Sequence, residues 1–433
     1  MSTEPSTMSR ARSAAAPEPT ATDPSRCDVL VVGGGPAGAT AAHELARAGH
    51  DVVLLDRAGR IKPCGGAVPP KLLEEFEVPR ETLEAEIDAA RMISPSARGV
   101  DMPIESGFVG MVDRGRFDEW LRARAARAGA RRVTGAFAAF GRSEGGYVEV
   151  RFREGRNGRD GAERTIGARL VVGADGARSG VARAAVPGAE RLRCVFAYHE
   201  IVETPPAVGA LGEADAAERK TAAVDPRRCD VLYEGALSPD FYSWIFPHGH
   251  CISVGTGTAR QGFGIRGSVS ELRRRVGLAG ARTLRTEGAP IPMKPLARWD
   301  DGRHVLLAGD AAGVVAPASG EGIYYAMASG RIAAETVAEA LATGDARVLR
   351  RARRRFLRAH GKVFFVLGLL QRFWYSSDRR RERFVTMCAD ADVQRLTWEA
   401  YLNKRLVRRD PLAHLRVLFK DLGHLVGIVP ASR

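Results

Sequence analysis

Residues 27–56 read CDVLVVGGGPAGATAAHELARAGHDVVLLD, and this stretch decides the fold. It opens with an apolar run, 29–32, of the kind found in strands that are buried on both faces. Glycines follow directly, and alanines then recur with a helical period until Gly49, a residue suited to ending a helix. A second apolar run closes at Asp56. Strand, helix and strand within about thirty residues predict the βαβ unit of a nucleotide-binding α/β domain.

The glycines have separate physical tasks at the turn between strand and helix. Gly33 permits the tight turn, Gly35 lets the backbone approach a pyrophosphate, and Gly38 lets the helix pack closely on the strand. Asp56 follows Gly33 by about twenty residues, where a carboxylate binds the ribose of an adenine dinucleotide. A glycine loop without a ligand is the alternative. The complete set of strand, helix and acid favours dinucleotide binding.

Composition limits the possible functions. The chain has 433 residues, 45% of them hydrophobic and 27% charged, which is typical of a globular protein with several domains. No apolar run approaches the roughly twenty residues of a membrane span, and the N-terminus lacks a secretion signal. Six scattered cysteines without C-x-x-C pairs argue against a zinc site or a disulfide framework and indicate a reducing compartment. We therefore expect no metal site.

The net charge of +14 suits a polyanionic partner, either nucleic acid or an anionic membrane surface. No nucleic-acid module can be recognised, and the aromatic residues are not interleaved with the basic runs, so no nucleic-acid partner is expected. An arginine-rich solvated surface accounts for most of the charge.

Three further polar positions extend the nucleotide pattern. Arg114 precedes a helical period that begins at Phe117, and its guanidinium could hold a phosphate or form a surface salt bridge. Two later apolar runs end in acids, at Asp175, which Gly176 follows, and at Asp310. Ligand contacts collect at the carboxyl edge of a parallel sheet, although each acid could equally cap a turn. Together with the glycine loop, these acids favour a ligand site at that edge.

Aromatic residues alternate in the middle of the chain, at Tyr242, Trp244 and Phe246. Alternation places the three side chains on one strand face, where they could line an elongated apolar pocket or form the ordinary core of an antiparallel sheet. Further along, residues 363–370 form an apolar run between arginine clusters. Such a run suits a helix lying in a membrane interface, and equally a helix packed on its own protein.

These motifs together resemble the FAD-binding superfamily of para-hydroxybenzoate hydroxylase. The cofactor-binding residues that the resemblance implies are Gly33, Gly35, Ala37, Gly38, Asp56, Arg114, Asp175, Gly176, Asp310, Gly320, Gly322 and Ile323, with the loop Cys64, Gly65 and Gly66 beside the isoalloxazine ring. Residues 255–257 contain two glycines but lack the third glycine and the following helix. A second dinucleotide domain is therefore not expected, and NADPH would dock transiently.

Several stretches are similar to the geranylgeranyl reductase family, in its bacteriochlorophyll and chlorophyll branch. They are residues 62–67, 91–96, 242–247, 319–324 and 383–405. The resemblance implies an NADPH-dependent flavoenzyme that reduces geranylgeranyl double bonds to give phytyl. The chain would be esterified to bacteriochlorophyllide or carried as the free diphosphate. The N-terminal leader and an insert between Pro205 and Pro226 depart from the family pattern.

The chemistry implied by this resemblance needs a proton donor. An isolated trisubstituted alkene has no carbonyl to accept charge, so a proton and a hydride from reduced FAD are expected to arrive nearly together. The substrate-binding residues that the resemblance implies are Tyr242, Trp244, Phe246 and Pro247. Aromatic ring faces can stabilise the developing positive charge. Cys64, Glu321 or water would supply the proton, and the sequence leaves this choice open.

The predicted fold class is α/β, or α+β overall. It comprises a Rossmann-like FAD-binding domain of the para-hydroxybenzoate hydroxylase type, an interleaved antiparallel-sheet substrate domain and a helical C-terminal region. The predicted boundaries are a disordered leader at 1–26, a discontinuous FAD-binding domain at 27–192 plus 294–345, a substrate domain at 193–293 and a helical basic region at 346–433. Within the FAD-binding domain, residues 60–112 are expected to contribute partly to the substrate side.

Two other functions remain open at this point. An FAD-dependent monooxygenase or halogenase would share the fold, and the aromatic stretch is similar to the halogenases' Trp-x-Trp-x-Ile-Pro, although both end positions differ. A non-enzymatic flavin-binding scaffold of pigment synthesis is the second alternative. The predicted location is the cytoplasm, peripherally on the photosynthetic intracytoplasmic membrane, with an anionic membrane surface as partner.

Overall fold

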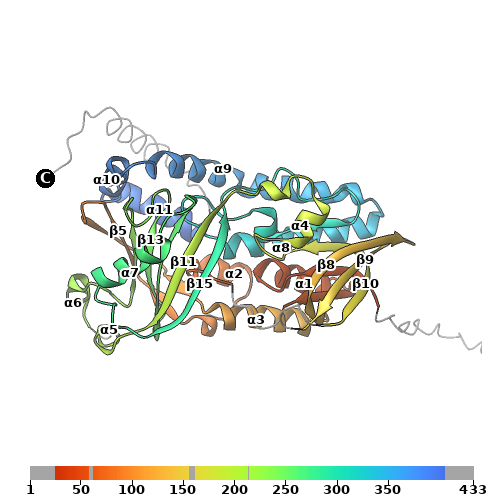
Figure 1. The fold of residues 1–433 in the computed structure, drawn as a ribbon, viewed down its shortest axis with the longest axis horizontal. Coiled ribbons are helices and arrows are strands. Elements are labelled where there is room, and N and C mark those ends of the chain that lie inside the picture. The colour runs from red at the N-terminus through yellow and green to blue at the C-terminus, as the bar shows by residue number, and fades with distance from the viewer. Residues whose placement is uncertain (1–24, 58–61, 156–160, 213, 405–433) are drawn as a thin grey trace, which may run out of the picture.

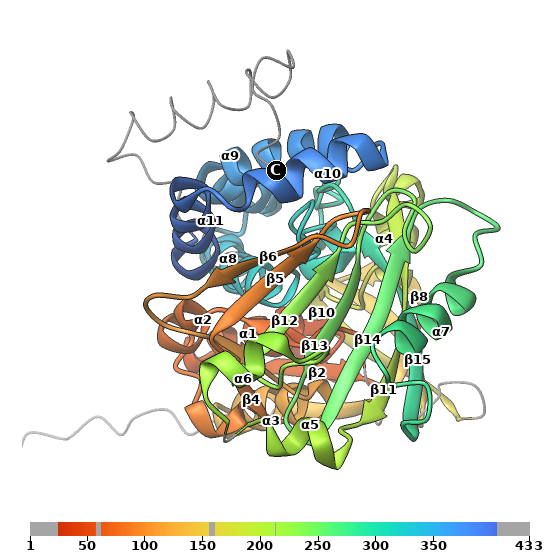
Figure 2. The same ribbon diagram turned by 90° about the vertical axis from the view of Figure 1, so that its left-hand side faces the viewer.

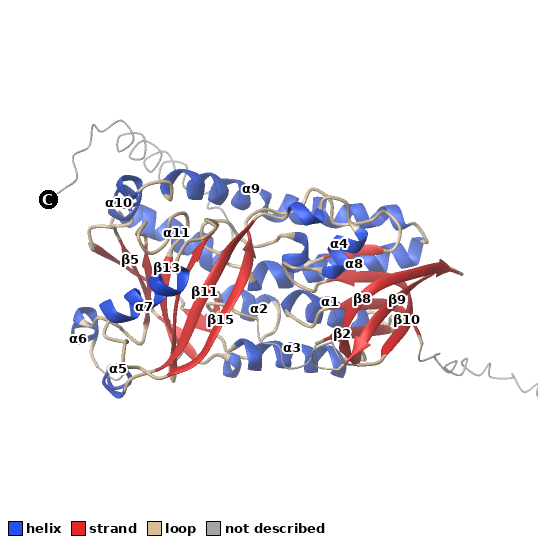
Figure 3. Ribbon diagram, viewed as in Figure 1, coloured by secondary structure: helices blue, strands red, loops and turns tan. Residues whose placement is uncertain are grey.

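The computed structural model describes residues 25–57, 62–155, 161–212 and 214–404. Two large β-sheets follow one another along the long axis of the molecule, and helices run beside them (Figure 1). The predicted α/β class with a helical C-terminal region is confirmed (Figure 3). Residues 1–24 of the predicted leader and residues 405–433 of the predicted basic region lie outside the described residues.

The βαβ unit predicted from residues 27–56 is present. β1 (Arg26–Val32) and β2 (Val52–Asp56) are parallel neighbours, and α1 (Pro36–Arg47) joins them. Both strands are buried over most of their length, which explains their unbroken apolar runs.

Parallel strands extend the unit on both sides. Their order is β8 (Arg131–Glu144), β2, β1, β10 (Glu163–Gly173) and β16 (Val305–Leu307). β9 (Tyr147–Glu154) pairs antiparallel with β8 and β10. Because β1, β2, β10 and β16 run in the same direction, the residues that follow them gather at one edge. This edge holds Gly33, Asp56, Asp175 and Asp310.

The second sheet has seven strands. Their order is β15 (Thr283–Pro292), β11 (Cys194–Glu203), β14 (Cys251–Thr258), β13 (Ser243–Pro247), β12 (Arg228–Leu232), β5 (Ala89–Ile93) and β6 (Gly99–Pro103). All neighbours are antiparallel except β12 and β5, which are parallel, so the sheet is mixed where a purely antiparallel one was predicted. The exception arises because β5 comes from a segment much earlier in the chain. Gly255 and Gly257 lie inside β14 and form no nucleotide loop.

A small third sheet joins β3 (Ala67–Val68), β7 (Val109–Met111) and β4 (Ala85–Ile87). Within the predicted segment 60–112, residues 67–111 supply this sheet and also β5 and β6 of the second one. The division of the chain into domains stays a prediction.

Besides α1 and two short helices of the insert described below, the described residues form α2 (Pro70–Glu75), α3 (Arg114–Arg127), α4 (Gly180–Ala185), α7 (Ile265–Arg275), α8 (Ile323–Thr343), α9 (Arg351–Trp374), α10 (Asp378–Met387) and α11 (Ala391–Asn403). α8 packs on α1 so closely that a Cβ on Gly330 would overlap the Ala37 carbonyl. Figure 2 shows α9, α10 and α11 gathered on one side of the molecule. Within the described residues, no helix has the length and apolarity needed to cross a membrane.

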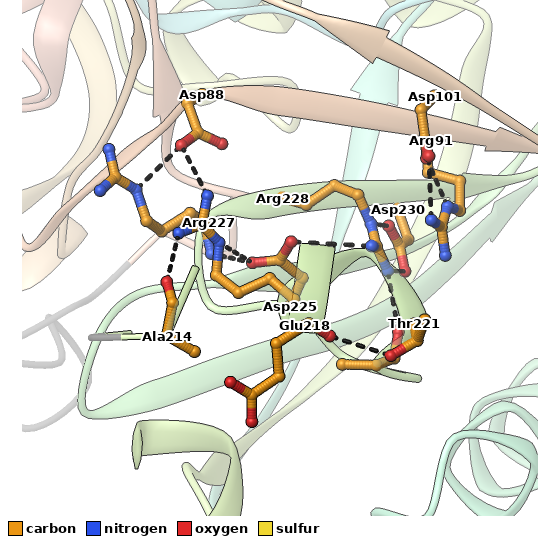
Figure 4. Close-up of polar contacts among 12 residues, drawn as sticks. Asp88, Arg91, Asp101, Ala214, Glu218, Thr221, Asp225, Arg227, Arg228 and Asp230 are labelled. Carbon is orange, nitrogen blue, oxygen red and sulfur yellow. Dashed lines mark hydrogen bonds and ion pairs between the residues drawn. The ribbon is translucent and has the colours of Figure 1, made fainter. Parts of the chain in front are cut away.

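The insert that the sequence left unexplained contains α5 (Pro206–Ala210) and α6 (Ala216–Thr221). A network of arginines and aspartates ties its end to the β12–β5 strand pair (Figure 4). The Arg228 guanidinium donates to Asp230 at 2.6 Å and lies 3.7 Å from Asp225, and all three side chains are buried. Arg219 of α6 reaches the carboxylate of Asp88, just before β5, at 3.4 Å. The network therefore fixes the insert against the second sheet.

Candidate active site

The glycine loop after β1 forms a cradle at the sheet edge. A Cβ on Gly33, whose φ is +106°, would overlap the Ala174 carbonyl, and a Cβ on Gly38 would overlap the Gly33 carbonyl. A Cβ on Gly35 would meet nothing within 4 Å, so the backbone there faces open space. No side chain caps the N-terminus of α1, which leaves its first N–H groups to an anion. These features fit the pyrophosphate of a dinucleotide, with Ala37 in the first turn of the helix.

Asp56 lies at the end of β2, beside this cradle. Arg122 of α3 donates to the Gly34 carbonyl at 3.2 Å, and its Nη1 lies 3.5 Å from Asp56 Oδ2. A side chain at Gly34 would collide with both residues. The Asp56 side chain keeps 26% of its surface exposed, which fits the predicted contact with ribose hydroxyls. No pattern in the sequence pointed to Arg122.

Asp310 follows β16 at the same edge and is buried. Its carboxylate forms an ion pair with Lys62, from the loop that carries Cys64. α8 begins beside it at Ile323, and no side chain caps this helix at Gly322. The helix N-terminus contributes partial positive charge. An acid, a cation and a helix end thus converge where the flavin end of FAD was predicted.

An apolar cavity of about 340 Å³ adjoins this group. Its walls come from the loop 62–67, from strands of the second sheet, from residues 315–323 and from α9 and α11. The predicted residues that line it are Cys64, Gly65, Gly66, Arg114, Tyr242, Trp244, Phe246, Asp310, Gly320, Glu321, Gly322 and Ile323. The remaining predicted cofactor residues lie outside this lining, around the sheet edge. The volume falls in the range of small-molecule sites.

The alternating aromatic residues form one wall of the cavity. The ring centroids of Tyr242 and Trp244 are 6.1 Å apart, and those of Trp244 and Phe246 are 6.2 Å apart. The Tyr242 hydroxyl donates to the Ser319 carbonyl at 2.6 Å and so ties the strand to the turn before α8. Pro247 is not among the residues that line the cavity, which is consistent with its position next to Phe246 on the strand, and substrate contact by Pro247 stays a prediction.

A polar network behind the wall holds the Trp244 ring in place. The indole N–H donates to Ser253 Oγ at 3.0 Å. His199, which also lines the cavity, has Nδ1 2.9 Å from Ser253 Oγ and Nε2 2.9 Å from Glu287 Oε2. Nothing in the sequence marks this network, because Trp244, Ser253, His199 and Glu287 lie on four separate strands.

The loop 64–66 is fixed from two sides. The Gly66 N–H donates to Cys64 Sγ at 3.4 Å. His248 Nε2 donates to the Gly65 carbonyl at 3.1 Å, and burial lowers the pKa of His248 to about 4, so that the ring is neutral at pH 7. These two hydrogen bonds fix the backbone of the loop, and the thiol of Cys64 lines the cavity.

Arg114 forms an ion pair, which was the alternative left open by the sequence, but the pair is buried and not at the surface. It is buried at the start of α3, and its guanidinium donates to both oxygens of Asp118 at 2.8 and 2.7 Å. The fork that was expected to hold a phosphate is thus occupied by a carboxylate one helical turn away. Cofactor contact by Arg114 stays a prediction.

Asp175 and Gly176 form a capped turn. The Asp175 carboxylate accepts a hydrogen bond from the Ser179 hydroxyl and another from the Gly180 N–H at 2.6 Å, while Ser179 caps α4. This is the alternative that the sequence left open, and burial also raises the pKa of Asp175. Cofactor contact at these two residues stays a prediction.

Glu321 is part of a buried ion pair. Its carboxylate contacts the ammonium of Lys404, and only 6% and 2% of the two side chains are exposed. Burial raises the pKa of Glu321 and Lys404 lowers it, whereas burial lowers the pKa of Lys404. The sequence did not indicate this partner, although Lys404 falls in the tail that carries part of the family resemblance.

Two family models match parts of the chain. The pyridine nucleotide-disulphide oxidoreductase family matches residues 27–204, which include the βαβ unit. The lycopene cyclase protein family matches residues 265–420, which include α8 and α9.

Relatives match nearly the whole chain. It is 52% identical to the geranylgeranyl diphosphate reductase of Rhodobacter capsulatus, over 93% of this chain and 98% of that protein. It is 38% identical to the chloroplastic geranylgeranyl diphosphate reductase of Oryza sativa, over 97% and 90%. It is 34% identical to the geranylgeranyl diphosphate reductase of Synechocystis, over 92% and 97%.

Solved structures share the fold. A geranylgeranyl bacteriochlorophyll reductase-like protein from Thermoplasma acidophilum superposes with a TM-score of 0.73 at 22% identity, covering 90% of this chain and 99% of that one. A flavin-dependent brominase superposes with a TM-score of 0.67 at 16% identity, covering 92% and 99%. The fold is therefore that of flavin-dependent oxidoreductases, and by its identity to full-length relatives the chain belongs to the geranylgeranyl diphosphate reductase family.

Proposed function

We propose that the protein is an FAD-dependent reductase that saturates the double bonds of a geranylgeranyl chain, with NADPH as the electron donor. The observation that carries this proposal is the apolar cavity that joins an aromatic wall to the nucleotide-binding sheet edge. A prenyl chain gains free energy when its apolar surface leaves water for such a cavity. The free diphosphate and the bacteriochlorophyllide ester are both candidate substrates.

The residues at the sheet edge fit FAD. The loop 33–38 would hold the pyrophosphate, Asp56 the ribose, and Asp310 with the N-terminus of α8 the flavin end. Reduced FAD supplies the hydride that the alkene needs. The chain's own task is to hold the alkene in place, exclude water and deliver a proton.

The aromatic wall suits an alkene that becomes electron-poor as it is protonated. The faces of Tyr242, Trp244 and Phe246 stabilise positive charge that develops at the tertiary carbon. Cys64 and Glu321 both line the cavity and are the candidate proton donors.

An anaerobic experiment tests the proposal. Protein loaded with FAD is bleached by NADPH and then mixed with geranylgeranyl diphosphate or its pigment ester. The expected result is recovery of the flavin colour together with a reduced prenyl product, identified by mass spectrometry. Phytanyl diphosphate, which has no double bond, is the control and should leave the flavin bleached.

The same experiment separates the alternatives. If the flavin regains its colour only with oxygen, and oxygen or halide appears in an aromatic product, the protein is a monooxygenase or halogenase. A flavin that NADPH bleaches but no prenyl compound recolours would refute the reductase and favour the scaffold.

We also propose that α9 rests on an anionic membrane surface, which would give the enzyme access to lipid-soluble substrate. Phe365, Val366 and Leu369 are exposed by 73%, 39% and 59%, and they lie on one side of the helix. Leu367, between them in sequence, lines the cavity. Residues 346–377 contain nine arginines or lysines and no acid at all, so the charge around the patch is complementary to anionic lipid.

A further inference from the structure

Lys404 lies outside the cavity lining, yet it contacts a residue that forms part of it. Its ammonium pairs with Oε2 of Glu321, and both side chains are almost fully buried. The other carboxylate oxygen, Oε1, is buried and has no hydrogen-bond partner among the described residues. A buried carboxylate oxygen without a partner is costly unless it serves a ligand or carries a proton.

The surroundings of Lys404 explain how an ammonium is tolerated there. Its Nζ lies 4.2 Å from the ring centroid of Tyr401 and 5.5 and 5.7 Å from those of Tyr324 and Tyr325. Three ring faces compensate part of the lost hydration. Lys404 itself follows α11 with a φ of +55°, an uncommon conformation for a side-chain-bearing residue. The chain thus accepts some backbone strain to place this ammonium beside Glu321.

Burial favours the neutral forms of the tyrosines and the histidine around the pair, and the nearby acid Glu75 pairs with Lys71 and Arg331. Burial raises the pKa of Tyr242, Tyr324, Tyr325 and Tyr401, and burial lowers the pKa of His360, whose ring packs on Tyr324 and Tyr325, to about 4. The thiol of Cys64 is on the cavity lining as well. Glu75 is the next acid, and the Tyr324 hydroxyl donates to it at 2.9 Å. Lys404 is therefore the charge in direct contact with Glu321.

We propose that Lys404 is a positioning residue for the reduction. Its ammonium fixes Oε2 of Glu321, leaves Oε1 as the proton-donating atom at the cavity, and stabilises the carboxylate that remains when the proton has gone. The proposal rests on the proposed function, since it names the donor for that reaction.

The proton transfer balances as a general-acid step. The O–H bond at Glu321 Oε1 breaks, and the proton forms a C–H bond with one alkene carbon by using the π electron pair. The hydride that completes the reduction brings two electrons to the other carbon. Glu321 is left as a carboxylate paired with the Lys404 ammonium, and solvent protonates Oε1 again during product exchange. If the Lys404 ammonium were absent, proton donation would leave the Glu321 carboxylate buried without a counter-charge.

The test measures flavin reoxidation in a single turnover across pH. FAD-loaded, NADPH-reduced protein is mixed anaerobically with geranylgeranyl diphosphate. The wild-type rate should fall as pH rises through the pKa of Glu321. In Lys404→Met this decline in rate should begin at least one pH unit higher, because the ammonium no longer lowers the pKa of Glu321. The maximum rate should drop about tenfold or more. Lys404→Arg should retain most of the wild-type rate. Glu321→Gln should reduce the rate about a hundredfold and abolish its dependence on pH.

Control variants separate a proton role from a structural one. Glu200→Gln removes a largely buried acid that pairs with Arg273 and does not line the cavity, and the rate of this variant should match the wild type. The double variant Glu321→Gln/Lys404→Met has no charge left at these two positions, so it should bind FAD and unfold near the wild-type temperature. Its rate of flavin reoxidation should be no higher than that of Glu321→Gln. A double variant with wild-type rate would overturn the proposal. So would Cys64→Ala losing the rate while Glu321→Gln keeps it.

Infrared titration of the oxidised protein without substrate gives a readout that does not depend on turnover. A carboxylic-acid C=O band that Glu321→Gln lacks should persist to higher pH in Lys404→Met than in the wild type. An unchanged band in Lys404→Met refutes the inference even if prenyl reduction is observed. If instead no prenyl compound reoxidises the wild-type flavin, the proposed function fails, and the proton-donating role assigned to the pair fails with it.

Discussion

At the scale of single residues, Gly35 and Gly38 lie in the same turn but have different surroundings. Gly35 has a φ of −76°, which any residue adopts, and open space where a Cβ would go. A Cβ at Gly38 would overlap the Gly33 carbonyl oxygen. The first glycine is therefore explained by a ligand and the second by packing.

Gly35→Ala and Gly38→Ala should separate FAD binding from stability. In the apoprotein, Gly35→Ala is expected to change the free energy of unfolding by less than about 0.5 kcal/mol. Gly38→Ala should lower it by roughly 3 kcal/mol, because backbone must move. Both should lose FAD, as measured by equilibrium titration of apoprotein. Normal FAD affinity in Gly35→Ala would show that no pyrophosphate approaches this backbone.

At the scale of secondary-structure elements, the insert depends on Arg228 at the start of β12. Replacing Arg228 with Leu leaves Asp225 and Asp230 buried without their cation, which should cost about 3–5 kcal/mol in free energy of unfolding. The neighbouring Arg227 pairs with Asp88 at 3.0 Å but is 47% exposed. Arg227→Leu should therefore cost less than about 1 kcal/mol. Urea unfolding of both variants measures the difference, and equal costs would contradict the buried-network explanation.

The exposed patch of α9 makes a prediction for membrane binding. Phe365→Ser/Leu369→Ser should weaken binding to phosphatidylglycerol vesicles by about tenfold or more in a sedimentation assay, since apolar area no longer enters the interface. Phe196→Ser is the control: it removes an apolar side chain on β11 that is 40% exposed, and this variant should bind the vesicles as the wild type does. Binding should also fall as salt rises. Wild-type binding by the double serine variant would show that α9 is not the contact.

At the scale of the whole molecule, His248 links the two large sheets. It extends from the end of β13 in the second sheet to the Gly65 carbonyl, in the loop that adjoins the nucleotide edge. Its side chain is buried, and burial lowers its pKa to about 4 from a model-peptide value of 6.5.

The stability of the molecule should therefore depend on pH below neutrality. Between pH 6.5 and about 4 the unfolded chain binds a proton that folded His248 excludes, so the free energy of unfolding falls as pH falls through this window. The contribution is at most about 3 kcal/mol and is constant below the window. His248→Gln should flatten this part of the pH profile in thermal unfolding. His250→Gln, at a side chain that is 65% exposed, should leave it unchanged, and the reverse pattern would contradict the assignment.

The local units of this protein could be predicted from the sequence. The βαβ unit and the alternation of the aromatic residues follow from period, glycine placement and strand-end acids, because these signals act between residues that are close in the chain, whereas the helix start at Ile323 was implied by the family resemblance. The flavin fold followed from the order of these units. The resemblance of 62–67, 242–247 and 319–324 to one family also marked three segments that line the cavity.

Only the tertiary structure decided which distant groups meet. The pairs Glu321–Lys404, Asp310–Lys62 and Trp244–Ser253 join separate elements, so no spacing in the sequence encodes them. The tertiary structure also shows that Arg114 pairs with Asp118, that Asp175 accepts hydrogen bonds from its own turn, and that Pro247 lies outside the cavity lining. The physical reason is burial: the charge state and partner of a side chain depend on which element excludes water from it, and that element is chosen by the packing of the whole chain.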